Sequence, residues 1–470
     1  MLTYPLSKES GRSLYEQLYE GIRRDILSGT LPAHQRLPSK RALAQHLEVS
    51  VITVKNAYEQ LAAEGYIYTV EKKGYYVSPL ESPLPPAAPP PLVPERPAEP
   101  VFLDLATGSL DRSYFPFTVW SRLMRQTILE EDTELLRSTP YNGAPALRRA
   151  IAAHLRQFRA MDVDPEQIII GAGSEYLMML LTQILGTSRT IAMENPTYRQ
   201  AYRVFESLGC QMKPVEMDAH GMNVRLLEES GADIAYVMPS HQYPMGVVMP
   251  VKRRQELLSW AGRGEKRYLI EDDYDSEFRY RGKPVPALQG MDIQGKVIYM
   301  GTFSKSIAPA IRVGYLVLPA PLLAVYKRKC GFYASTVSRI DQKIIYQFLT
   351  EGHYERHLNR MRAIYKGKHD VLMSELKTLG TEFIVQGEYA GLHVLLKYRK
   401  AGMETWLVEE AAKARVGVYG ISGFLIAPLA DQKEKCFSTV VLGYARLNED
   451  QIREGIRRLA AAWKCSRPCP

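Results

Sequence analysis

Apolar residues recur with helical spacing near the start of the chain. The positions that carry this stripe lie four residues apart: Leu14, Leu18, Ile22 and Ile26. This period predicts an amphipathic helix whose apolar face turns towards a small core. The pair Ser28-Gly29 interrupts the pattern, so we expect the helix to end there.

Two more helices and a hairpin are expected before residue 78. Ser39 and Ser50 are favourable N-cap residues, and each is followed by apolar residues at helical spacing. Gly65 is placed to end the third helix, because glycine readily adopts the conformation of a helix C-terminus. Short runs at 66–70 and 75–77 then predict two strands joined by a basic turn. Three helices followed by such a hairpin predict a winged helix-turn-helix.

A proline-rich stretch separates this module from the rest of the chain. Ten of the 22 residues from 79 to 100 are proline, and no apolar periodicity is present. Such a segment builds no core and favours extended polyproline II, at about 3.1 Å per residue. We therefore predict a DNA-binding domain over 1–78, a linker over 79–100 and a larger ligand-binding domain over 101–465.

The larger domain alternates short apolar runs with amphipathic helices. The runs are Ile168–Ile170, Ile191–Met193, Ile234–Met238, Tyr268–Ile270 and Val297–Met300. This alternation predicts an α/β fold, a doubly wound and mostly parallel sheet with helices on both faces. Ligands of such sheets bind at the carboxyl ends of the strands.

Composition and charge narrow the class of protein only slightly. The 470 residues are 46% hydrophobic and carry a net charge of +9. Residues 1–77 hold 10 Lys and Arg against 8 Asp and Glu, a surplus of 2, so charge favours a polyanionic partner without locating its site. The first residues contain no apolar run and no run of eighteen apolar residues occurs in the sequence, so we expect neither a leader nor a membrane span. Its five cysteines lack metal-site spacing, so we expect a cytoplasmic protein with free thiols and no metal.

Candidate DNA contacts cluster on the third predicted helix and at the hairpin. A recognition helix presents polar and basic side chains to base edges while its other face packs. Basic residues on the preceding helix and at the hairpin tip can reach phosphates, and the hairpin can enter a minor groove. The candidates are Arg41, Ser50, Ile52, Thr53, Lys55, Asn56, Lys72 and Lys73. The alternative is a helical bundle used only for dimerisation.

Residues 37–77, LPSKRALAQHLEVSVITVKNAYEQLAAEGYIYTVEKKGYYV, resemble the GntR-type winged helix along their whole length. The resemblance implies that double-stranded DNA is the partner of this domain. One position departs from it, since Val51 stands where many of these domains have a base-contacting arginine. Direct readout is therefore expected to depend more on Lys55, Asn56 and Arg41, and Val51 can meet a thymine methyl group.

Two loops of the larger domain carry groups suited to a phosphorylated aldehyde. Lys305 lies in a loop of small residues after the last predicted strand, where burial would lower its pKa and make it a Schiff-base candidate. The turn Gly171–Glu175 leads into a helix, whose free N–H groups suit a phosphate. Thr302, Ser304 and Arg312 would complete a phosphate cup. Taken alone, a lysine in such a loop is more often a surface lysine, and it is the other groups that favour the Schiff-base role.

An acidic segment follows the strand at 268–270. An aspartate there would keep a pyridine nitrogen protonated, and Tyr274 could contact the neighbouring ring oxygen. Asp272 and Asp273 are both candidates, and acidic residues at a strand end are otherwise commonly solvated caps. A lysine, a carboxylate and a phosphate cup are what pyridoxal 5'-phosphate needs.

Six motifs spread over residues 171–447 strengthen this interpretation. They are GAGSEY, ENPTY, PSHQYPMG, EDDYDSEF, GTFSKSIAPAIRVGY and GYARL. In order and spacing they resemble fold-type I aminotransferases, which have a large mixed sheet and a small α+β subdomain. Together with the GntR-type head and the proline-rich linker, the whole chain resembles the MocR/GabR family of transcriptional regulators.

This resemblance implies a role for each motif residue. Lys305 would be the Schiff-base lysine, and Asp272, 33 residues before it, the partner of the pyridine nitrogen in preference to Asp273. Tyr274 would contact the 3'-oxygen, Tyr198 would stack on the ring, and Arg446, in a strand-like run at 442–447, would hold the effector's carboxylate. The residues implied around the phosphate are Ser174, Glu175, Ser304 and Arg312. Pyridoxal 5'-phosphate and a homodimer are implied as well.

Two positions depart from the pattern of the enzymes. Tyr243 stands where aminotransferases have the asparagine of Asn-Pro-Thr-Gly, which predicts weakened turnover. Gln200, flanked by Arg199 and Arg203, stands near the place of a second effector-binding arginine.

We therefore expect a pyridoxal-phosphate-dependent, DNA-binding regulator that senses an amino-bearing molecule through aldimine exchange at Lys305. The alternative is a functional class I/II aminotransferase with an appended DNA-binding head. The sequence leaves open the operator, the sign of regulation, residual transaminase turnover and the effector. Candidate effectors are a GABA-like amine, a D- or L-amino acid, a dipeptide or the cofactor itself.

Overall fold

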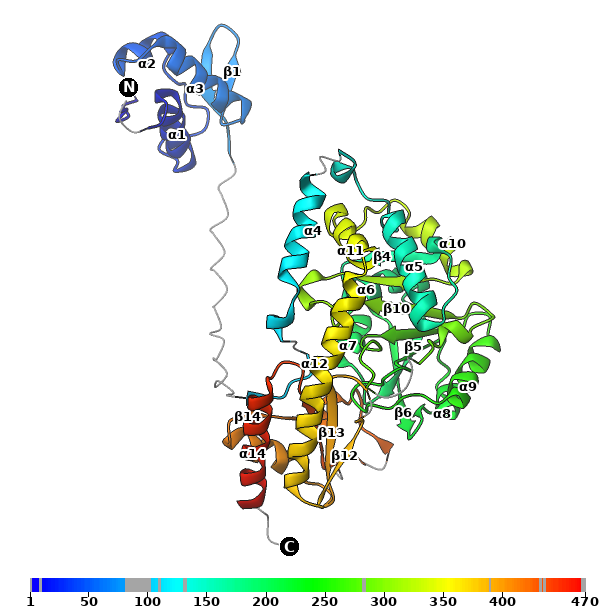
Figure 1. Ribbon diagram of the computed structural model, residues 1–470. Coiled ribbons are helices and arrows are strands. Elements are labelled where there is room, and N and C mark those ends of the chain that lie inside the picture. The colour runs from blue at the N-terminus through cyan, green and yellow to red at the C-terminus, as the bar shows by residue number, and fades with distance from the viewer. Residues whose placement is uncertain are drawn as a thin grey trace. The chain divides into compact units, whose positions relative to one another are not determined.

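The computed structural model describes residues 2–7, 11–80, 103–108, 111–129, 133–280, 285–388, 390–430, 433 and 437–465 (Figure 1). The chain divides into two compact units, Met1–Pro97 and Ala98–Pro470. Of the predicted linker 79–100, only the first two residues lie within the described part of the chain. Each unit has a hydrophobic core of its own.

The N-terminal unit consists of three helices and a hairpin. Its elements are α1 (Leu14–Leu27), α2 (Lys40–His46), α3 (Val51–Ala63), β1 (Ile67–Val70) and β2 (Gly74–Val77). The hydroxyl groups of the predicted caps accept hydrogen bonds from backbone N–H groups, Ser39 from Ala42 and Ser50 from Thr53. The predicted winged helix-turn-helix is therefore confirmed, and α2 and α3 start at their predicted caps.

Apolar stripes of the three helices meet in one core. Fully buried members include Leu18 and Ile22 of α1, Leu43 of α2, and Val54 and Leu61 of α3. This is the arrangement that the four-residue spacing predicts, because such residues share one helix face.

The wing has a third extended segment that the apolar pattern does not predict. The backbone N–H groups of His34 and Leu37 donate to the carbonyl groups of Val77 and Tyr75. His34 has a positive φ of 66°, and the extended residues are 35–37, with Arg36 opposite Tyr76 of β2. Residues 34–37 carry no alternation of apolar and polar side chains, so only their pairing with β2 reveals the segment.

The second unit contains an eight-stranded sheet with the order β4-β11-β10-β9-β8-β5-β6-β7. The strands are β4 (Ile168–Gly171), β5 (Thr190–Asn195), β6 (Gln211–Asp218), β7 (Gly221–Met222), β8 (Ile234–Val237), β9 (Tyr268–Asp273), β10 (Val297–Thr302) and β11 (Gly314–Val317). Strands β6, β5, β8, β9 and β10 pair in parallel, while β11 and β7 pair antiparallel with their neighbours. The prediction of a mostly parallel sheet is confirmed. One detail was wrong: the acidic residues 271–273 belong to β9 itself, because the strand continues beyond its apolar run.

Helices cover both faces of this sheet. They are α4 (Phe117–Leu129), α5 (Pro145–Arg159), α6 (Ser174–Leu185), α7 (Arg199–Ser207), α8 (Val224–Glu229), α9 (Val251–Gly262), α10 (Ala320–Cys330), α11 (Arg339–Thr350) and α12 (His353–Leu376). Alternate residues of β4 enter different cores: Ile168 and Ile170 pack with α5, α11 and α12, whereas Ile169 packs with α6, α7 and α10. A strand buried on both sides reads as a continuous apolar run, which explains the pattern in the sequence. No helix in the described residues is both long and apolar enough to cross a membrane.

A smaller subdomain follows α12. Its sheet has the order β12 (Phe383–Gln386), β13 (His393–Tyr398), β16 (Thr439–Gly443) and β15 (Tyr419–Gly420), packed with α13 (Glu404–Lys413) and α14 (Glu449–Cys465). The first described strand after the linker, β3 (Leu103–Asp104), pairs in parallel with β14 (Val416–Gly417) of the same subdomain. The expected strand over 442–447 was wrong, since β16 ends at Gly443 and Arg446 lies beyond it.

Candidate functional site

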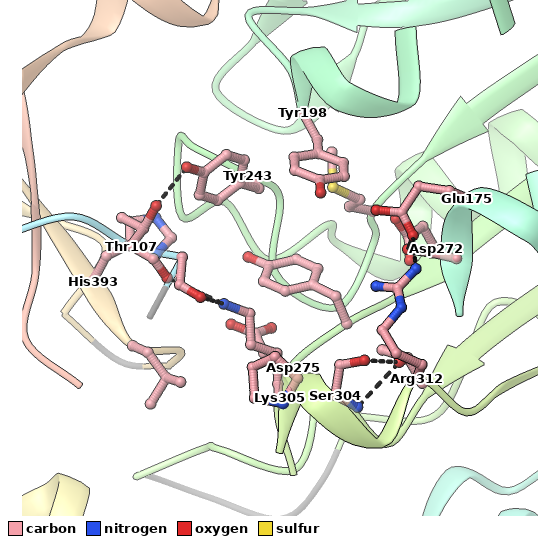
Figure 2. A pocket seen from close by; sticks show the side chains of 17 residues that line it. Thr107, Glu175, Tyr198, Tyr243, Asp272, Asp275, Ser304, Lys305, Arg312 and His393 are labelled. Atoms are coloured by element: carbon pink, nitrogen blue, oxygen red, sulfur yellow. Dashed lines mark hydrogen bonds and ion pairs between the residues drawn. The ribbon is translucent and has the colours of Figure 1, made fainter. Parts of the chain in front are cut away.

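The parallel strands of the large sheet end at a cavity of about 210 Å³ (Figure 2). Its lining includes all nine residues proposed from the sequence for the cofactor: Ser174, Glu175, Tyr198, Asp272, Tyr274, Thr302, Ser304, Lys305 and Arg312. These residues come from segments at or after the carboxyl ends of β4, β5, β9 and β10, and from the loop before β11. Other lining residues were not among the site residues proposed from the sequence. They are Thr107, Gly108, Met238, Asp275, Pro309, Leu392 and His393.

Lys305 points into the cavity from the loop after β10. Its ammonium group donates hydrogen bonds to the backbone carbonyl oxygens of Thr107, at 3.1 Å, and Gly108, at 3.3 Å (Figure 2). Burial lowers the pKa of Lys305, and the negative charge of Asp275 opposes this shift. A lysine with a lowered pKa is more often neutral, which is the form that attacks an aldehyde.

Asp272 and Asp273 lie on opposite faces of β9, as adjacent strand residues do. Asp272 faces the cavity, and the phenol of Tyr236 donates a hydrogen bond to it. Asp273 faces away and forms a buried ion pair with Arg159, at 2.8 Å, while the Tyr299 phenol donates to it at 2.6 Å. Because Asp273 is already compensated outside the cavity, the geometry favours Asp272 as the partner of a ring nitrogen.

The other end of the cavity combines a helix N-terminus with a guanidinium group. Arg312 lies over the start of α6 and forms an ion pair with Glu175, at 2.6 Å. A Cβ atom at Gly173 would lie 2.6 Å from an Arg312 nitrogen, so only glycine permits this approach. Burial, the largest single influence, raises the pKa of Glu175, but the hydrogen bonds and positive charge of Arg312, the backbone N–H of Glu175 and the Ser174 hydroxyl together lower it further, so the net shift is downward. Hydroxyl groups of Ser174, Thr302 and Ser304 complete a set of donors suited to a phosphate.

This donor set fits pyridoxal 5'-phosphate. Burial raises the pKa of Asp272 to about 7 although the Tyr236 hydrogen bond lowers it, so its charged form would be stabilised further by a protonated pyridine nitrogen. Lys305 and the phosphate donors line the same cavity, so a cofactor that carries an aldehyde and a phosphate would find partners for both groups there.

Two tyrosines form an aromatic wall. The rings of Tyr198 and Tyr243 meet edge to face with centroids 6.0 Å apart. The Tyr243 hydroxyl is 2.6 Å from the Thr107 hydroxyl (Figure 2). Tyr243, in the place of the enzymes' asparagine, therefore ties the large subdomain to the segment that follows the linker.

Arg446 does not line the cavity. Its guanidinium is 3.8 Å from the Asp104 carboxylate and its side chain is 56% exposed. The Tyr419 phenol donates to the same carboxylate at 2.8 Å. Arg199 and Gln200, suggested as neighbours of the effector, are exposed and also lie outside the cavity lining.

The DNA-binding candidates present a mixed surface. Ile52 is 67% exposed and Val51 46%, so both apolar side chains are available to bases. Lys55 is exposed and 3.6 Å from Glu59, whereas the Ser50 and Thr53 hydroxyls are bonded to each other in the helix cap. Exposed positions also hold the basic and amide candidates Arg41, Asn56, Lys72 and Lys73.

Arg36 is a further exposed cation beside the wing. Its guanidinium lies 3.7 Å from the position that a Cβ of Gly74 would take, at the start of β2. Arg36 could not be proposed from the sequence, because the pairing of residues 34–37 with β2 follows only from the folded structure.

Comparisons with known proteins agree with this architecture. The model of the family described as bacterial regulatory proteins, gntR family, matches residues 14–77. The model of aminotransferase class I and II matches residues 100–459. The fold and the two matches define a class of protein in which a gntR-type head is joined to an aminotransferase-like domain.

Full-length relatives have the same organisation. The uncharacterized HTH-type transcriptional regulator YdeL of Bacillus subtilis is 38% identical and covers 96% of this chain and 97% of its own. The probable rhizopine catabolism regulatory protein MocR of Rhizobium meliloti is 31% identical, covering 97% and 95%. The chain therefore belongs to this family of HTH-type transcriptional regulators. Among solved structures, a Pyrococcus horikoshii kynurenine aminotransferase in complex with PMP has a TM-score of 0.67 at 25% identity, covering 78% of this chain and 92% of its own.

Asp272 should make the stability of the unloaded protein depend on pH. Its folded-state pKa of about 7 exceeds the ordinary 3.8, so folding favours the protonated form. This contribution is complete below about pH 4 and is lost as pH rises through 7. We expect Asp272→Asn to raise the melting temperature at pH 8 relative to wild type, and much less at pH 5. The exposed Asp162→Asn should leave the wild-type profile unchanged, and parallel profiles for Asp272→Asn and wild type would refute the assignment.

Proposed function

We propose that this protein is a cytoplasmic, homodimeric regulator that binds double-stranded DNA through residues 1–78 and senses an amino-bearing molecule through pyridoxal 5'-phosphate at Lys305. The observation that carries this proposal is the convergence of nine cofactor candidates on one cavity, in a chain that also has a recognition helix. When bound, the cofactor would supply an aldehyde that captures amines.

Each residue of the cavity has a separate task in this proposal. With the cofactor bound, the Lys305 amine would hold its aldehyde group, and the Asp272 carboxylate would keep the ring nitrogen protonated. Tyr198 would cover the ring, and the Tyr274 hydroxyl would donate to the ring oxygen. The residues that hold the phosphate are Ser174, Thr302, Ser304 and Arg312, with Glu175 orienting the last of these.

Residues 103–108 connect the cavity to the linker. Lys305 bonds to the carbonyl groups of Thr107 and Gly108, and Arg446 lies beside Asp104. Lys305 must release these carbonyl groups to bond the cofactor, and Arg446 must leave Asp104 to hold an effector's carboxylate. Residues 103–108 come shortly after the linker. Their release from Lys305 and Arg446 is therefore the route by which binding of cofactor and effector in the cavity would affect the DNA-binding heads.

Footprinting tests the DNA-binding part of this proposal. Full-length protein should protect two half-sites upstream of its own gene or an adjacent one, since each dimer carries two heads. Absence of protection, with and without pyridoxal 5'-phosphate, would leave the head unexplained and favour the alternative of an aminotransferase.

Two variants separate the kinds of DNA contact. Lys72→Ala should weaken binding to all sequences alike and reduce the salt slope by about one, as loss of a phosphate contact does. Asn56→Ala should instead narrow the difference in affinity between operator and random DNA by roughly 1–3 kcal/mol. If both variants behave alike, the recognition helix does not read bases as proposed.

A further inference from the structure

Two buried polar residues beside Tyr274, His241 and Asp275, have no task in the proposed function. His241 and Asp275 are 2% and 3% exposed, and the His241 Nδ1 atom is 2.9 Å from the Asp275 carboxylate. The Tyr274 hydroxyl is 3.0 Å from the same Nδ1 atom. Asp275 itself reaches the cavity beside Lys305 (Figure 2). The imidazole, the carboxylate and the phenol therefore form one buried cluster.

The surroundings of the imidazole favour one tautomer. Within the described part of the chain, the His241 Nε2 atom is buried without a hydrogen-bond partner. A proton on Nε2 would be a buried donor with no acceptor, which costs more than an unpaired acceptor with the proton on Nδ1. With its proton on Nδ1, His241 donates towards the Asp275 carboxylate and lies within reach of the Tyr274 oxygen.

The small subdomain holds this imidazole in place. Gly391, just before β13, packs so closely that a Cβ atom there would lie 2.0 Å from His241 Cε1 and 2.8 Å from the Asp275 carboxylate. Gly391 is anchored on both sides, because its N–H donates to the Phe278 carbonyl and its carbonyl accepts from Tyr444. The ring has no room to turn away from Tyr274.

We propose that His241 and Asp275 are positioning residues that fix the phenol of Tyr274 and the location of its proton. Tyr274 is the residue proposed at the ring oxygen, so this pair would support the ring-oxygen end of the cavity through it. The role of the pair towards the cofactor rests on the proposed function, because Tyr274 is the residue through which it acts.

The titratable groups that face Tyr274 are Asp275, Tyr243 and Asp272, in addition to His241. The ring of His393 is tilted by 44° against that of His241, with ring centroids 5.1 Å apart. Any pH-dependent readout must therefore be taken as a difference between variants that leave these other groups in place.

A double-mutant cycle tests the proposal in the full-length protein. His241→Phe and Tyr274→Phe, alone and combined, are compared by pyridoxal 5'-phosphate affinity and by the pH midpoint of the bound chromophore's absorbance. We expect His241→Phe to weaken binding about 2- to 12-fold, the worth of one hydrogen bond. It should also shift the midpoint in the same direction as Tyr274→Phe. In the Tyr274→Phe background it should do neither. Equal effects of His241→Phe in both backgrounds would overturn the proposal.

Conservative variants sharpen the test. His241→Asn places an amide nitrogen where Nδ1 lies and should restore the wild-type midpoint, whereas His241→Gln places it where Nε2 lies and should not. Gly391→Ala should reproduce the His241→Phe shift, and Gly380→Ala, with a similar positive φ but no neighbour within 4 Å, should not. Rescue by glutamine, or no difference between the two glycine variants, would contradict the proposed geometry.

A readout without cofactor separates this proposal from the proposed function. The melting temperatures of the same four proteins, measured unloaded, should be non-additive if His241 and Tyr274 are coupled. Failure of the wild type to take up pyridoxal 5'-phosphate would refute the proposed function. The melting temperatures measured without cofactor would still test whether His241 and Tyr274 are coupled. Additive melting temperatures would refute the pair alone.

Discussion

Lys305→Ala is expected to abolish covalent attachment of pyridoxal 5'-phosphate. The wild type, incubated with the cofactor, should absorb at roughly 420 nm, and borohydride should make the bond between cofactor and protein irreversible, as in proteins of this cofactor class. The variant should show neither property, because no other lysine lines the cavity within the described residues. Absorbance and the mass of the reduced protein measure the change.

The fold should survive this substitution. Among the described residues, the Lys305 side chain makes two hydrogen bonds, both to backbone carbonyl groups, so its loss removes little packing. Lys296→Ala is a matched control, since Lys296 also bonds two carbonyl groups but lies outside the cavity. A borohydride-stable adduct in Lys305→Ala, or its loss in Lys296→Ala, would show that the Schiff-base lysine is elsewhere.

Residues 1–78 alone are expected to bind operator DNA about 10²- to 10⁴-fold more weakly than the full-length protein. The isolated head should fold, because its core is formed by its own three helices and hairpin. It loses the second head of the proposed dimer, and with it the avidity that linked binding provides. Titration of both proteins against one operator, at one salt concentration, measures the ratio.

Circular dichroism of the isolated head is the control for folding. Its affinity for DNA should still fall with salt, since the exposed cations Arg41, Lys55, Lys72 and Lys73 remain. Equal affinity of head and full-length protein would show that the larger domain contributes no second head.

The periodic parts of the fold could be predicted from the sequence. Helix caps at Ser39 and Ser50 and the buried strands of the large sheet follow from local pattern, because burial on one or both faces imposes a period. The end of β16 before Arg446 could not be predicted, since apolar residues continue past the last paired residue. The segment 34–37 could not be predicted either, because its pairing with β2, and no local pattern of side chains, determines its conformation.

The site could be predicted where a motif joins chemistry to a strand end, as at Lys305 in its small-residue loop after β10. Tyr198 was implied only by the family resemblance, and all nine candidates line one cavity. His241 and Asp275 could not be found, because 34 residues separate them and only packing brings them together. The contact of Lys305 with residues 107 and 108 likewise depends on how the chain returns to the sheet after the linker.

Operator affinity with the cavity empty and filled is the measurement that tests the central claim most directly. Wild type and Lys305→Ala are titrated against one operator without cofactor, with pyridoxal 5'-phosphate, and with the cofactor plus each of γ-aminobutyrate, D- and L-alanine and an alanine dipeptide. Coupling between the cavity and the heads predicts that filling the cavity changes wild-type affinity about 5- to 150-fold, in either direction. The variant should show one affinity throughout. One and the same wild-type affinity under every condition, or an equal response in Lys305→Ala, would contradict the account.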